Sequence, residues 1–422
     1  MLTIISVLTY FNAILINKVK RLTAKRVICV LFVFVLVLGL SYSKYSSYFQ
    51  DFFPNTRSEV YSLLSVIGLS YYSFSALSYI IDVYKGKDEV DYDFFDVLLW
   101  MTLFTKIVAG PIERHKHFKE SVRGKESSFN YDIIKYGLLM CAGGYFYKIV
   151  IADRLSIFVD TVYSELDQNY GIVLLLTMIL YSLQIYFDFA GYSLIAKGTA
   201  MSFGIEITNN FNHPYFSQGI VDFWKRWHIS LSLWLRDYVY IPLGGNKKGK
   251  FRQYINILLT FIVSGLWHGT GINYVIWGVL HGLYQIFEKG LNLDKRIQSK
   301  AIKVVFTFLA VSFAWIFFRA PSLKQAAIFI VHMMQWNPWV LSGNTLVSYG
   351  LDYNNWIVVI ASVFVSIVVE YYQYKGKSVH RLLQKQNIVV RWLIYYSLIV
   401  LLLIFGKYSQ NFDSNSFIYF KY

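Results

Sequence analysis

The chain has 422 residues, of which 56% are hydrophobic, 19% are aromatic and only 15% are charged. A soluble domain is usually about 45–50% apolar and about 25% charged, so this composition excludes an ordinary soluble globule and a disordered chain. The net charge is +15. Because the basic residues lie between apolar runs, the charge indicates basic cytoplasmic loops of a membrane protein, not nucleic-acid binding. Cys29 and Cys141 lie in apolar runs and suggest no disulfide framework or metal set.

Repeated apolar runs of about 17–20 residues predict an all-α polytopic membrane protein, organised as one domain over residues 1–422. In the first run the positive charges follow the apolar residues, so we expect a retained span and not a signal peptide. The predicted spans are 2–17, 27–42, 60–82, 134–150, 171–190, 254–268, 272–288, 301–319, 355–373 and 390–406.

The charges of the loops predict how these spans are oriented. Basic loops at 18–26, 206–253, 289–300 and 375–391 are assigned to the cytoplasmic side, and the acidic loop 151–170 is assigned to the outside.

Two further segments must return to the side from which they started for these assignments to alternate. Residues 254–288 are predicted to form a hairpin, and residues 96–110 are predicted to enter the membrane and turn back at Gly110-Pro111. Re-entrant backbone is tolerated only where it is buried in protein or lines a polar cavity. Counting the crossings then places both termini outside.

Asp188 lies in the second half of a long apolar helix, in LQIYFDFAGYS. A carboxylate at membrane depth costs about 2.5–3.5 kcal/mol, so it needs a partner or a polar cavity. Lys197 lies nine residues further on, and Tyr192 shares the helical face at i+4. Two interpretations stay open: a structural ion pair or hydrogen bond between helices, or a residue that lines a reaction chamber.

Residues 210–256 combine an apolar stripe with basic side chains. An amphipathic helix on the cytoplasmic leaflet gives this pattern, but the density of tryptophan and histidine is high for an anchor. The glycine- and lysine-rich segment after Pro242 is either a phosphate-binding turn or, more simply, a solvated one. The stripe is formed by Ile220, Trp224, Trp227, Leu231, Trp234 or Leu235, and Tyr238, beside Lys225, Arg226, Arg236 and Asp237.

His268 ends an apolar run of about fifteen residues, which at 1.5 Å per residue reaches about 22 Å and falls short of a full crossing. Gly265, Gly269 and Gly271 surround it and permit a break or a close approach, and His281 follows on the next apolar helix. A neutral imidazole is suited to accept a proton at this depth. The alternative is a histidine satisfied within the core. We expect no metal, because no carboxylate or cysteine lies at metal-site spacing.

Seven blocks of the chain form a family pattern: YYSFSALSYIIDVYKG (71–86), IVAGPIERHKHF (107–118), KIVIADRLS (148–156), YFDFAGYSLIAKGTA (186–200), NFNHPYFSQGIVDFWKRWHISLSLWLRDYVYIPLGGNKKG (210–249), SGLWHGTGINYVIWGVLHGL (264–283) and FIYFKY (417–422). The pattern resembles the membrane-bound O-acyltransferases, above all the alginate and peptidoglycan O-acetyltransferase membrane subunits of bacteria. The D-alanyl transferase of teichoic acid synthesis is a more distant relative.

The resemblance implies a ring of about nine to eleven transmembrane helices with re-entrant segments. A tunnel would run through its thinned centre from a cytoplasmic donor to an extracellular acceptor. Residues 206–253 would form an amphipathic or re-entrant funnel on the cytoplasmic side, and residues 407–422 an extracytoplasmic aromatic motif. Family members usually begin with one or two further hydrophobic helices, whereas this chain starts at what looks like the next one.

The resemblance also assigns roles to particular residues. The histidine of the family's WHG block is catalytic and carries over to His268. The tryptophan-flanked histidine carries over to His228 as a second functional candidate, and His281 matches the third histidine, in the LHG block. Tyr419 sits where an acyl-carrying tyrosine is suspected; otherwise the terminal segment is an interfacial aromatic anchor.

We therefore expect His268 to act as a general base toward a hydroxyl and then to protonate a thiolate. The acyl donor would be a thioester, acetyl-CoA or an acylated phosphopantetheine carrier, bound as a substrate and not as a tight cofactor. Its phosphates would be favoured by charged or polar side chains at the donor entrance. These are His228, Lys225, Arg226 and Arg236; the further predicted binding residues are Asp188, Asn212, Trp227, Trp267 and His281.

The acyl group would pass to Tyr419 or to a serine of a partner, and then to a polysaccharide outside the bacterial cytoplasmic membrane. The resemblance alone points to an extracytoplasmic acetyltransferase of the SGNH type as that partner. Two alternatives stay open: a polysaccharide or lipid transporter with a His/Asp proton relay, and an inactive scaffold for a secreted acetyltransferase.

Overall fold

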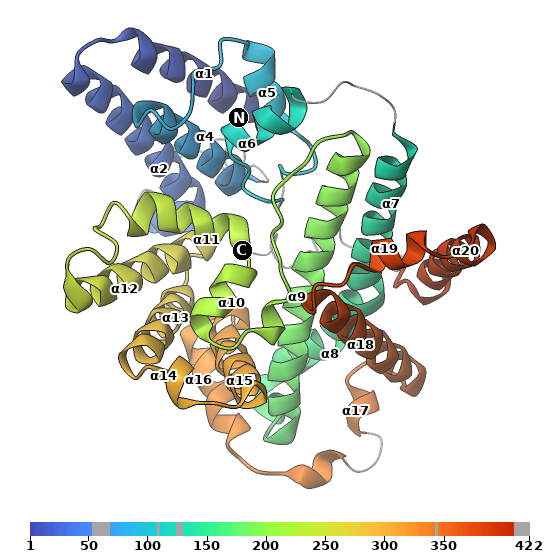
Figure 1. The fold of residues 1–422 in the computed structure, drawn as a ribbon. Helices are drawn as coiled ribbons and strands as arrows, with labels where there is room; N and C mark the ends of the chain where they lie inside the picture. The colour runs from blue at the N-terminus through green and yellow to red at the C-terminus, as the bar shows by residue number, and fades with distance from the viewer. Residues whose placement is uncertain (53–67, 108–109, 124–129, 342–344, 409–422) are drawn as a thin grey trace. The chain divides into compact units, whose positions relative to one another are not determined.

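The computed structural model describes residues 1–52, 68–107, 110–123, 130–341 and 345–408, and these ranges contain helices and loops but no β-strand (Figure 1). The all-α polytopic class is confirmed, whereas the ring and its tunnel stay predictions. Each predicted span coincides with a helix where it is described. Two compact units are present. Unit 1 comprises Met1–Leu138, Ala196–Asn209 and Leu233–Tyr238; unit 2 comprises Leu139–Ile195, Asn210–Ser232 and Val239–Tyr422.

Unit 1 is built around α4, in which every residue from Leu69 to Ile80 is buried except Ser70. This helix packs against α1 and α2, and α1 also packs against α5. The nine residues of α5 extend only about 14 Å, too short for a crossing. Gly110 lies close to the end of this segment, since a Cβ there would be 2.4 Å from the Lys106 Cα. The helices of unit 1 are α1 (Leu2–Lys18), α2 (Leu22–Phe52), α4 (Leu69–Tyr84), α5 (Phe94–Thr102) and α6 (His115–Arg123).

Unit 2 contains a continuous apolar core, formed mainly by residues of α8, α9, α10, α13, α15, α16 and α18. Helices α7, α9 and α11 have residues in both units. The remaining elements are α7 (Tyr131–Tyr145), η1 (Phe146–Ala152), α8 (Asp153–Ser164), η2 (Leu166–Gln168), α9 (Ile172–Ser202), η3 (Pro214–Phe216), α10 (Ile220–Arg226), α11 (Ile229–Leu235), η4 (Arg236–Tyr240), α12 (Gly249–His268), α13 (Ile272–Gly290), α14 (Leu293–Arg296), α15 (Lys300–Arg319), α16 (Leu323–Met333), η5 (Pro338–Leu341), α17 (Thr345–Ser348), α18 (Tyr353–Tyr374), α19 (Val379–Gln384) and α20 (Ile388–Phe405).

The prediction of a loop over 151–170 is wrong, because most of these residues are helical. The π-helix η1 leads directly into α8, which buries an apolar face made of Leu155, Phe158, Val159 and Val162. This i, i+3, i+4, i+7 spacing predicts a helix, but the acidic residues of the segment had led to its interpretation as a loop.

The tryptophan-rich segment is also not one helix on a membrane surface. It forms two seven-residue helices, α10 and α11, separated at His228, whose φ of +42° ends the helical path. The apolar stripe is buried and not facing lipid head groups, since Ile220, Trp224 and Leu231 are at most 8% exposed. The following turn uses its backbone amides internally, as in the hydrogen bond from Gly245 N–H to the Tyr240 carbonyl, and this supports the simple turn.

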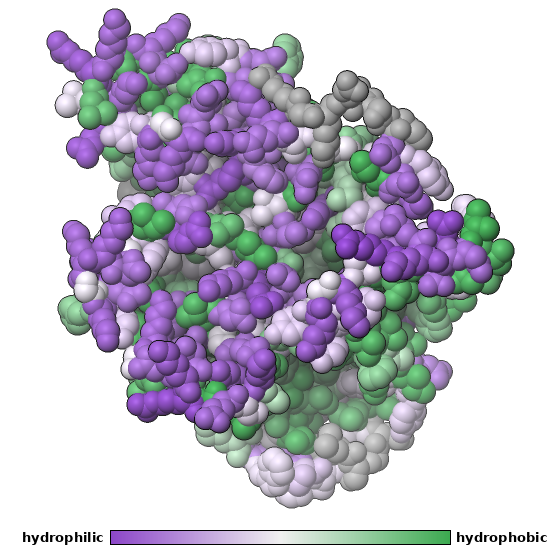
Figure 2. Space-filling model, viewed as in Figure 1, coloured by the Kyte–Doolittle hydropathy of each residue, from purple (hydrophilic) through white to green (hydrophobic). Residues whose placement is uncertain are grey.

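Five helical segments within the described ranges are long and apolar enough to cross a membrane: Leu22–Tyr45, α9, α15, α18 and α20. In α20 no residue is buried, and Figure 2 shows its hydrophobic side chains gathered at the right-hand edge beside the hydrophilic α19. A long apolar helix with no buried residue and most of its surface exposed requires a surrounding of lipid or protein. The protein is therefore a multi-pass membrane protein.

Helices α12 and α13 lie side by side (Figure 1) and approach closely because glycines replace larger side chains at their contact. A Cβ at Gly278 would lie 2.2 Å from the Phe261 carbonyl oxygen, and a Cβ at Gly265 would lie 2.3 Å from the Tyr274 carbonyl oxygen. Real Cβ atoms do not approach backbone so closely. This contact positions His268 and His281, one on each helix.

We predict that Gly278→Ala forces α12 and α13 apart and lowers the stability of the folded protein by about 1–3 kcal/mol, as overpacking does elsewhere. The thermal unfolding midpoint of the purified protein in detergent measures this. The control is Gly143→Ala in α7, where nothing lies within 4 Å of the added Cβ. Equal midpoints for the two variants would show that the helices do not need this glycine.

Candidate functional site

His268 is the last residue of α12, and only 5% of it is exposed. Its ring lies edge-on to three aromatic side chains, with centroid distances of 4.7 Å to Trp267, 4.9 Å to Trp277 and 5.2 Å to Phe318. A Cβ at Gly269 would lie 2.3 Å from the ring of Tyr274, so the turn into α13 needs glycine there. The imidazole is thus held among aromatic rings at a corner between two helices.

The three predicted histidines belong to one aromatic cluster of unit 2. The Trp267 ring lies 6.2 Å from the ring of His228 as well as 4.7 Å from that of His268. In the same way Trp277 lies 4.9 Å from His268 and 5.0 Å from His281. Motifs that are forty residues apart in the sequence therefore meet, and each of these two tryptophans is close to two of the imidazoles.

His281 is fully buried, and its hydrogen-bonding pattern identifies its tautomer. The indole Nε1–H of Trp224 donates to the His281 Nδ1 over 3.2 Å. An indole nitrogen only donates, so Nδ1 of His281 is the acceptor and the ring hydrogen is on Nε2. The lone pair of this histidine is already used, so His281 is poorly placed to act as a base.

His228 is 1% exposed and lies in the loop between α10 and α11. Its Nδ1 lies 3.1 Å from the Asn210 Oδ1, and the ring of Phe189 packs edge-on against it at 4.8 Å. Burial lowers the pKa of His228 to about 3, so the imidazole is neutral at physiological pH. A neutral ring carries no charge that attracts phosphate, which leaves the lysine and arginines as the cations of the predicted donor entrance.

Asp188 forms a buried ion pair with Lys148 of η1, with 2.5 Å between Nζ and Oδ1, and Lys148 also lies 2.7 Å from the Asp153 Oδ1. The interpretation of Asp188 as part of a structural ion pair between helices is confirmed. The partner is Lys148, whereas Lys197 bonds to Asn209. Lys148 was overlooked, although a lone lysine in the apolar run FYKIVIA is itself a signal of a buried charge.

The other predicted binding residues differ in their surroundings. Trp227 is buried in the aromatic core against Phe223 and Trp315. Lys225 and Asn212 are exposed.

The two predicted arginines are each paired with a carboxylate. Arg226 is paired with Asp222 at 2.8 Å in unit 2. Arg236 belongs to unit 1 and pairs with Asp237, also at 2.8 Å. Tyr419 lies outside the described residues, and among those described no set of three or more His, Cys, Asp or Glu forms a potential metal site. The roles of these residues stay predictions.

A buried carboxylate in α18 was missed by sequence reasoning. Glu370 is 6% exposed, and its Oε1 accepts hydrogen bonds from the hydroxyls of Tyr147 and Tyr186 at 2.9 and 2.7 Å. The Nδ1 of His213 lies 3.8 Å from its other oxygen. The signal was a single glutamate in the apolar sequence IVVIASVFVSIVVEYYQY. These contacts join α18 to η1 and α9.

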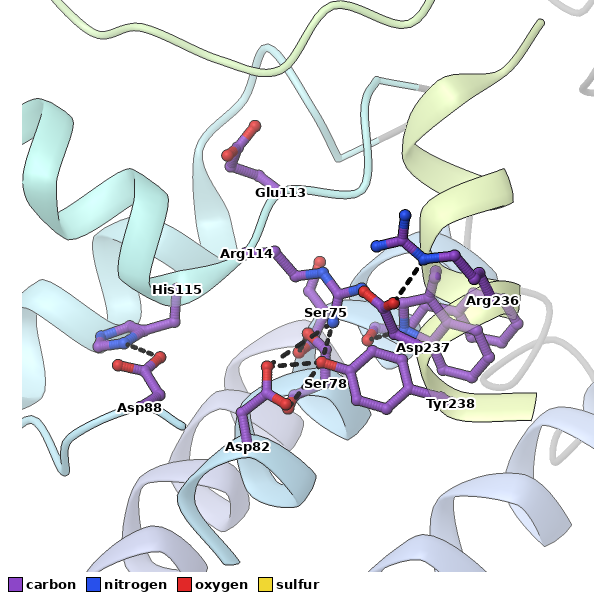
Figure 3. A network of polar contacts seen from close by, with 12 residues as sticks. Ser75, Ser78, Asp82, Asp88, Glu113, Arg114, His115, Arg236, Asp237 and Tyr238 are labelled. Carbon is purple, nitrogen blue, oxygen red and sulfur yellow. Dashed lines mark hydrogen bonds and ion pairs between the residues drawn. The ribbon is translucent and has the colours of Figure 1, made fainter. Parts of the chain in front are cut away.

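Arg114 is the centre of a polar network in unit 1, which Figure 3 shows from close by. Its Nη2 lies 3.1 Å from Asp237, its Nη1 bonds to the Tyr238 hydroxyl, and Nη1 lies 3.7 Å from Asp82. The Tyr238 hydroxyl in turn donates to Asp82 over 2.6 Å. Together with Lys87 and neighbouring residues they line a cleft of about 280 Å³. Three blocks of the family pattern are thus joined by one guanidinium.

Comparisons with known proteins identify the family. A sequence model described as the membrane-bound O-acyltransferase family matches residues 1–324. The chain is 40% identical over 281 residues to the probable alginate O-acetylase of Pseudomonas putida, covering 66% of this chain and 57% of that protein. It is 32% identical over 352 residues to the peptidoglycan O-acetyltransferase of Helicobacter pylori, with coverages of 76% and 67%. It is 30% identical over 281 residues to the teichoic acid D-alanyltransferase of Bacillus subtilis, with coverages of 63% and 71%.

The chain therefore belongs to the membrane-bound O-acyltransferase family, and the resemblance noted from its motifs is confirmed. It spans a little over half the length of the alginate O-acetylases that it matches. The family match ends before α18, so Glu370 lies beyond the matched residues.

We predict that Lys148→Met is far more destabilising than Asp188→Asn. The first change leaves two carboxylates without their cation, a loss of about 3–5 kcal/mol for a buried pair, whereas after the second Lys148 keeps Asp153. Thermal unfolding midpoints in detergent compare the variants. Lys135→Met, which breaks the exposed Lys135–Asp132 pair, is the control and should change little. The ion pair is not a main support of the fold if Lys148→Met behaves like this control.

The His117–Glu113 pair in unit 1 predicts a pH dependence of stability. The hydrogen bond to the buried Glu113 carboxylate raises the pKa of His117. Its stabilising effect is therefore complete below about pH 6.5, the ordinary histidine value, and is lost as the pH rises through the higher folded-state pKa. We expect the unfolding midpoint of the unmodified protein to fall across this window, and that of His117→Gln to fall less. His332→Gln is the control, because the Nδ1 of His332 faces the Leu166 carbonyl and not a carboxylate. An equal change of unfolding midpoint with pH for all three proteins would contradict the prediction.

Proposed function

We propose that the protein is a membrane O-acyltransferase of the bacterial cytoplasmic membrane. It takes an acetyl or related acyl group from a cytoplasmic thioester and passes it on for O-acetylation of a cell-surface polysaccharide. The family match and the names of the relatives support this class of reaction. The observation that carries the proposal is the placement of His268 among aromatic rings, with the His228 ring near the same Trp267 ring.

His268 is the general base of the proposed reaction. Its imidazole takes the proton of the attacking hydroxyl while the oxygen bonds to the thioester carbonyl carbon. When the carbon–sulfur bond breaks, the same proton goes to the departing thiolate, so no net proton is gained or lost. The rings of Trp267, Trp277 and Phe318 restrict water around the histidine and fix its orientation. Competing hydrolysis of the thioester is thereby reduced.

The donor is proposed to be acetyl-CoA or an acylated phosphopantetheine carrier. Lys225 is exposed, and Arg226 is partly buried and partly neutralised by Asp222. We therefore assign the first contact with phosphate to Lys225, with Arg226 as a further cation of the same unit. The acceptor is Tyr419 or the serine of an SGNH-type partner, followed by a polysaccharide outside the membrane.

The transporter alternative depends on a proton relay between Asp188 and a histidine. The charge of Asp188 is compensated by Lys148 at 2.5 Å, which makes the carboxylate a poor carrier of protons. The acyltransferase proposal uses no such relay.

We predict that His268→Ala reduces acyl transfer by about 10²–10⁴-fold, the usual contribution of a general base, while the protein is made in normal amounts. The measurement is the exchange or hydrolysis of labelled acetyl-CoA by purified protein, with glycan O-acetyl content in cells as the second readout. His332→Ala removes a histidine of α16, outside the aromatic cluster, and should retain activity. Unchanged glycan acetylation in the His268→Ala strain would remove this residue from the mechanism.

A further inference from the structure

Asn210 makes an unusually complete set of contacts next to His228. Its Oδ1 lies 3.1 Å from the His228 Nδ1, 3.3 Å from the backbone nitrogen of Ser230 and 2.9 Å from the Ser230 Oγ. Its Nδ2 donates to the Ser193 Oγ over 3.4 Å. All four residues are at most 6% exposed and belong to unit 2. Asn210 was not among the residues that the sequence suggested.

These contacts assign the hydrogen of the His228 ring. A backbone N–H only donates, so the side-chain atom of Asn210 that receives the Ser230 N–H must be the amide oxygen. An oxygen without a hydrogen only accepts. The Nδ1 of His228, which faces the same oxygen, therefore carries the ring hydrogen, and Nε2 carries the lone pair.

The backbone around His228 is fixed by the same residue. The Asn210 carbonyl accepts the Ile229 N–H over 2.9 Å, and the Asn210 Oδ1 takes the Ser230 N–H, one of the first amides of α11 that have no partner within the helix. His228 has a positive φ of 42°, a conformation that is strained for a non-glycine residue and persists only where its surroundings hold it. Asn210 therefore holds both the backbone and the ring of His228.

We propose that Asn210 is a positioning residue that keeps the His228 hydrogen on Nδ1 and makes Nε2 the acceptor in the site. The group that His228 recognises is then a hydrogen-bond donor, such as the hydroxyl, thiol or amide N–H of a substrate, and not a phosphate. Burial supports this because it keeps the ring neutral. The proposal deepens the proposed function and depends on it only for the reaction that the substrate undergoes.

The first test reads the tautomer directly and needs no activity. Nitrogen NMR of protein labelled with ¹⁵N-histidine, compared with the spectrum of His228→Gln, identifies the His228 signals. We expect hydrogen on Nδ1 in the unmodified protein and a shift toward Nε2–H in Asn210→Leu. Asn210→Asp keeps an oxygen for all three donors, so it should fold, retain the Nδ1 hydrogen and raise the pH at which the ring titrates. Asn256→Asp changes another buried amide of unit 2 and should leave the His228 signals unchanged.

The second test measures transfer from labelled acetyl-CoA. Asn210→Leu should lower kcat about 10–100-fold with little change in KM for the donor. Asn210→Asp should keep most of the rate of the unmodified protein, and the acidic limb of its pH–rate profile should move to higher pH. Hydrogen on Nε2 of His228 in the unmodified protein, or an Asn210→Asp profile that coincides with that of Asn256→Asp, would overturn the proposal. If the tautomer is as expected but no thioester reacts with the unmodified protein, the proposed function fails and the role of Asn210 stands.

Discussion

The close contact of α12 with α13 is the constraint on which the site depends. Both helices bear a histidine of the family pattern, and these side chains share Trp277 only because Gly265 and Gly278 let the two backbones touch. A Cβ at either glycine would clash with a backbone oxygen of the facing helix, so a larger residue there would force the two helices to shift. The glycines flanking the histidine motifs are therefore part of the site, although none of them has a functional group.

Buried polar groups in unit 2 follow one rule: each costs free energy unless a specific neighbour compensates it. Asp188 has Lys148, Glu370 has two tyrosine hydroxyls, and Asn210 has three donors around one oxygen. The partners come from distant parts of the chain, so each pair also fixes the packing of two helices. A polar side chain in an apolar run thus indicates where helices must meet.

Sequence reasoning located the helices at the predicted spans, five of which are long and apolar enough to cross a membrane among the described residues, and it located the three histidines through their motifs. It did not identify Lys148 or Glu370 as partners, since the cost of a buried charge is visible in the sequence but the neighbour that compensates it depends on packing. The break at His228 was missed for a related reason. The apolar spacing of the segment continues through the break. The positive φ of His228 depends on contacts with Asn210, which the sequence pattern does not reveal.

The tautomers separate the roles of the histidines more sharply than their motifs do. His281 accepts the Trp224 indole N–H at Nδ1, whereas His228 donates from Nδ1 to Asn210, so their neighbours impose opposite tautomers. The lone pair of His281 is used within the protein, and that of His228 is on Nε2. A site that must move a proton between a hydroxyl and a thiolate needs basic nitrogens, and His281 supplies none. In the proposed reaction the proton transfer is therefore assigned to His268 and the recognition of a hydrogen-bond donor to His228, and His281 acts by holding Trp224 and Trp277 in place beside them.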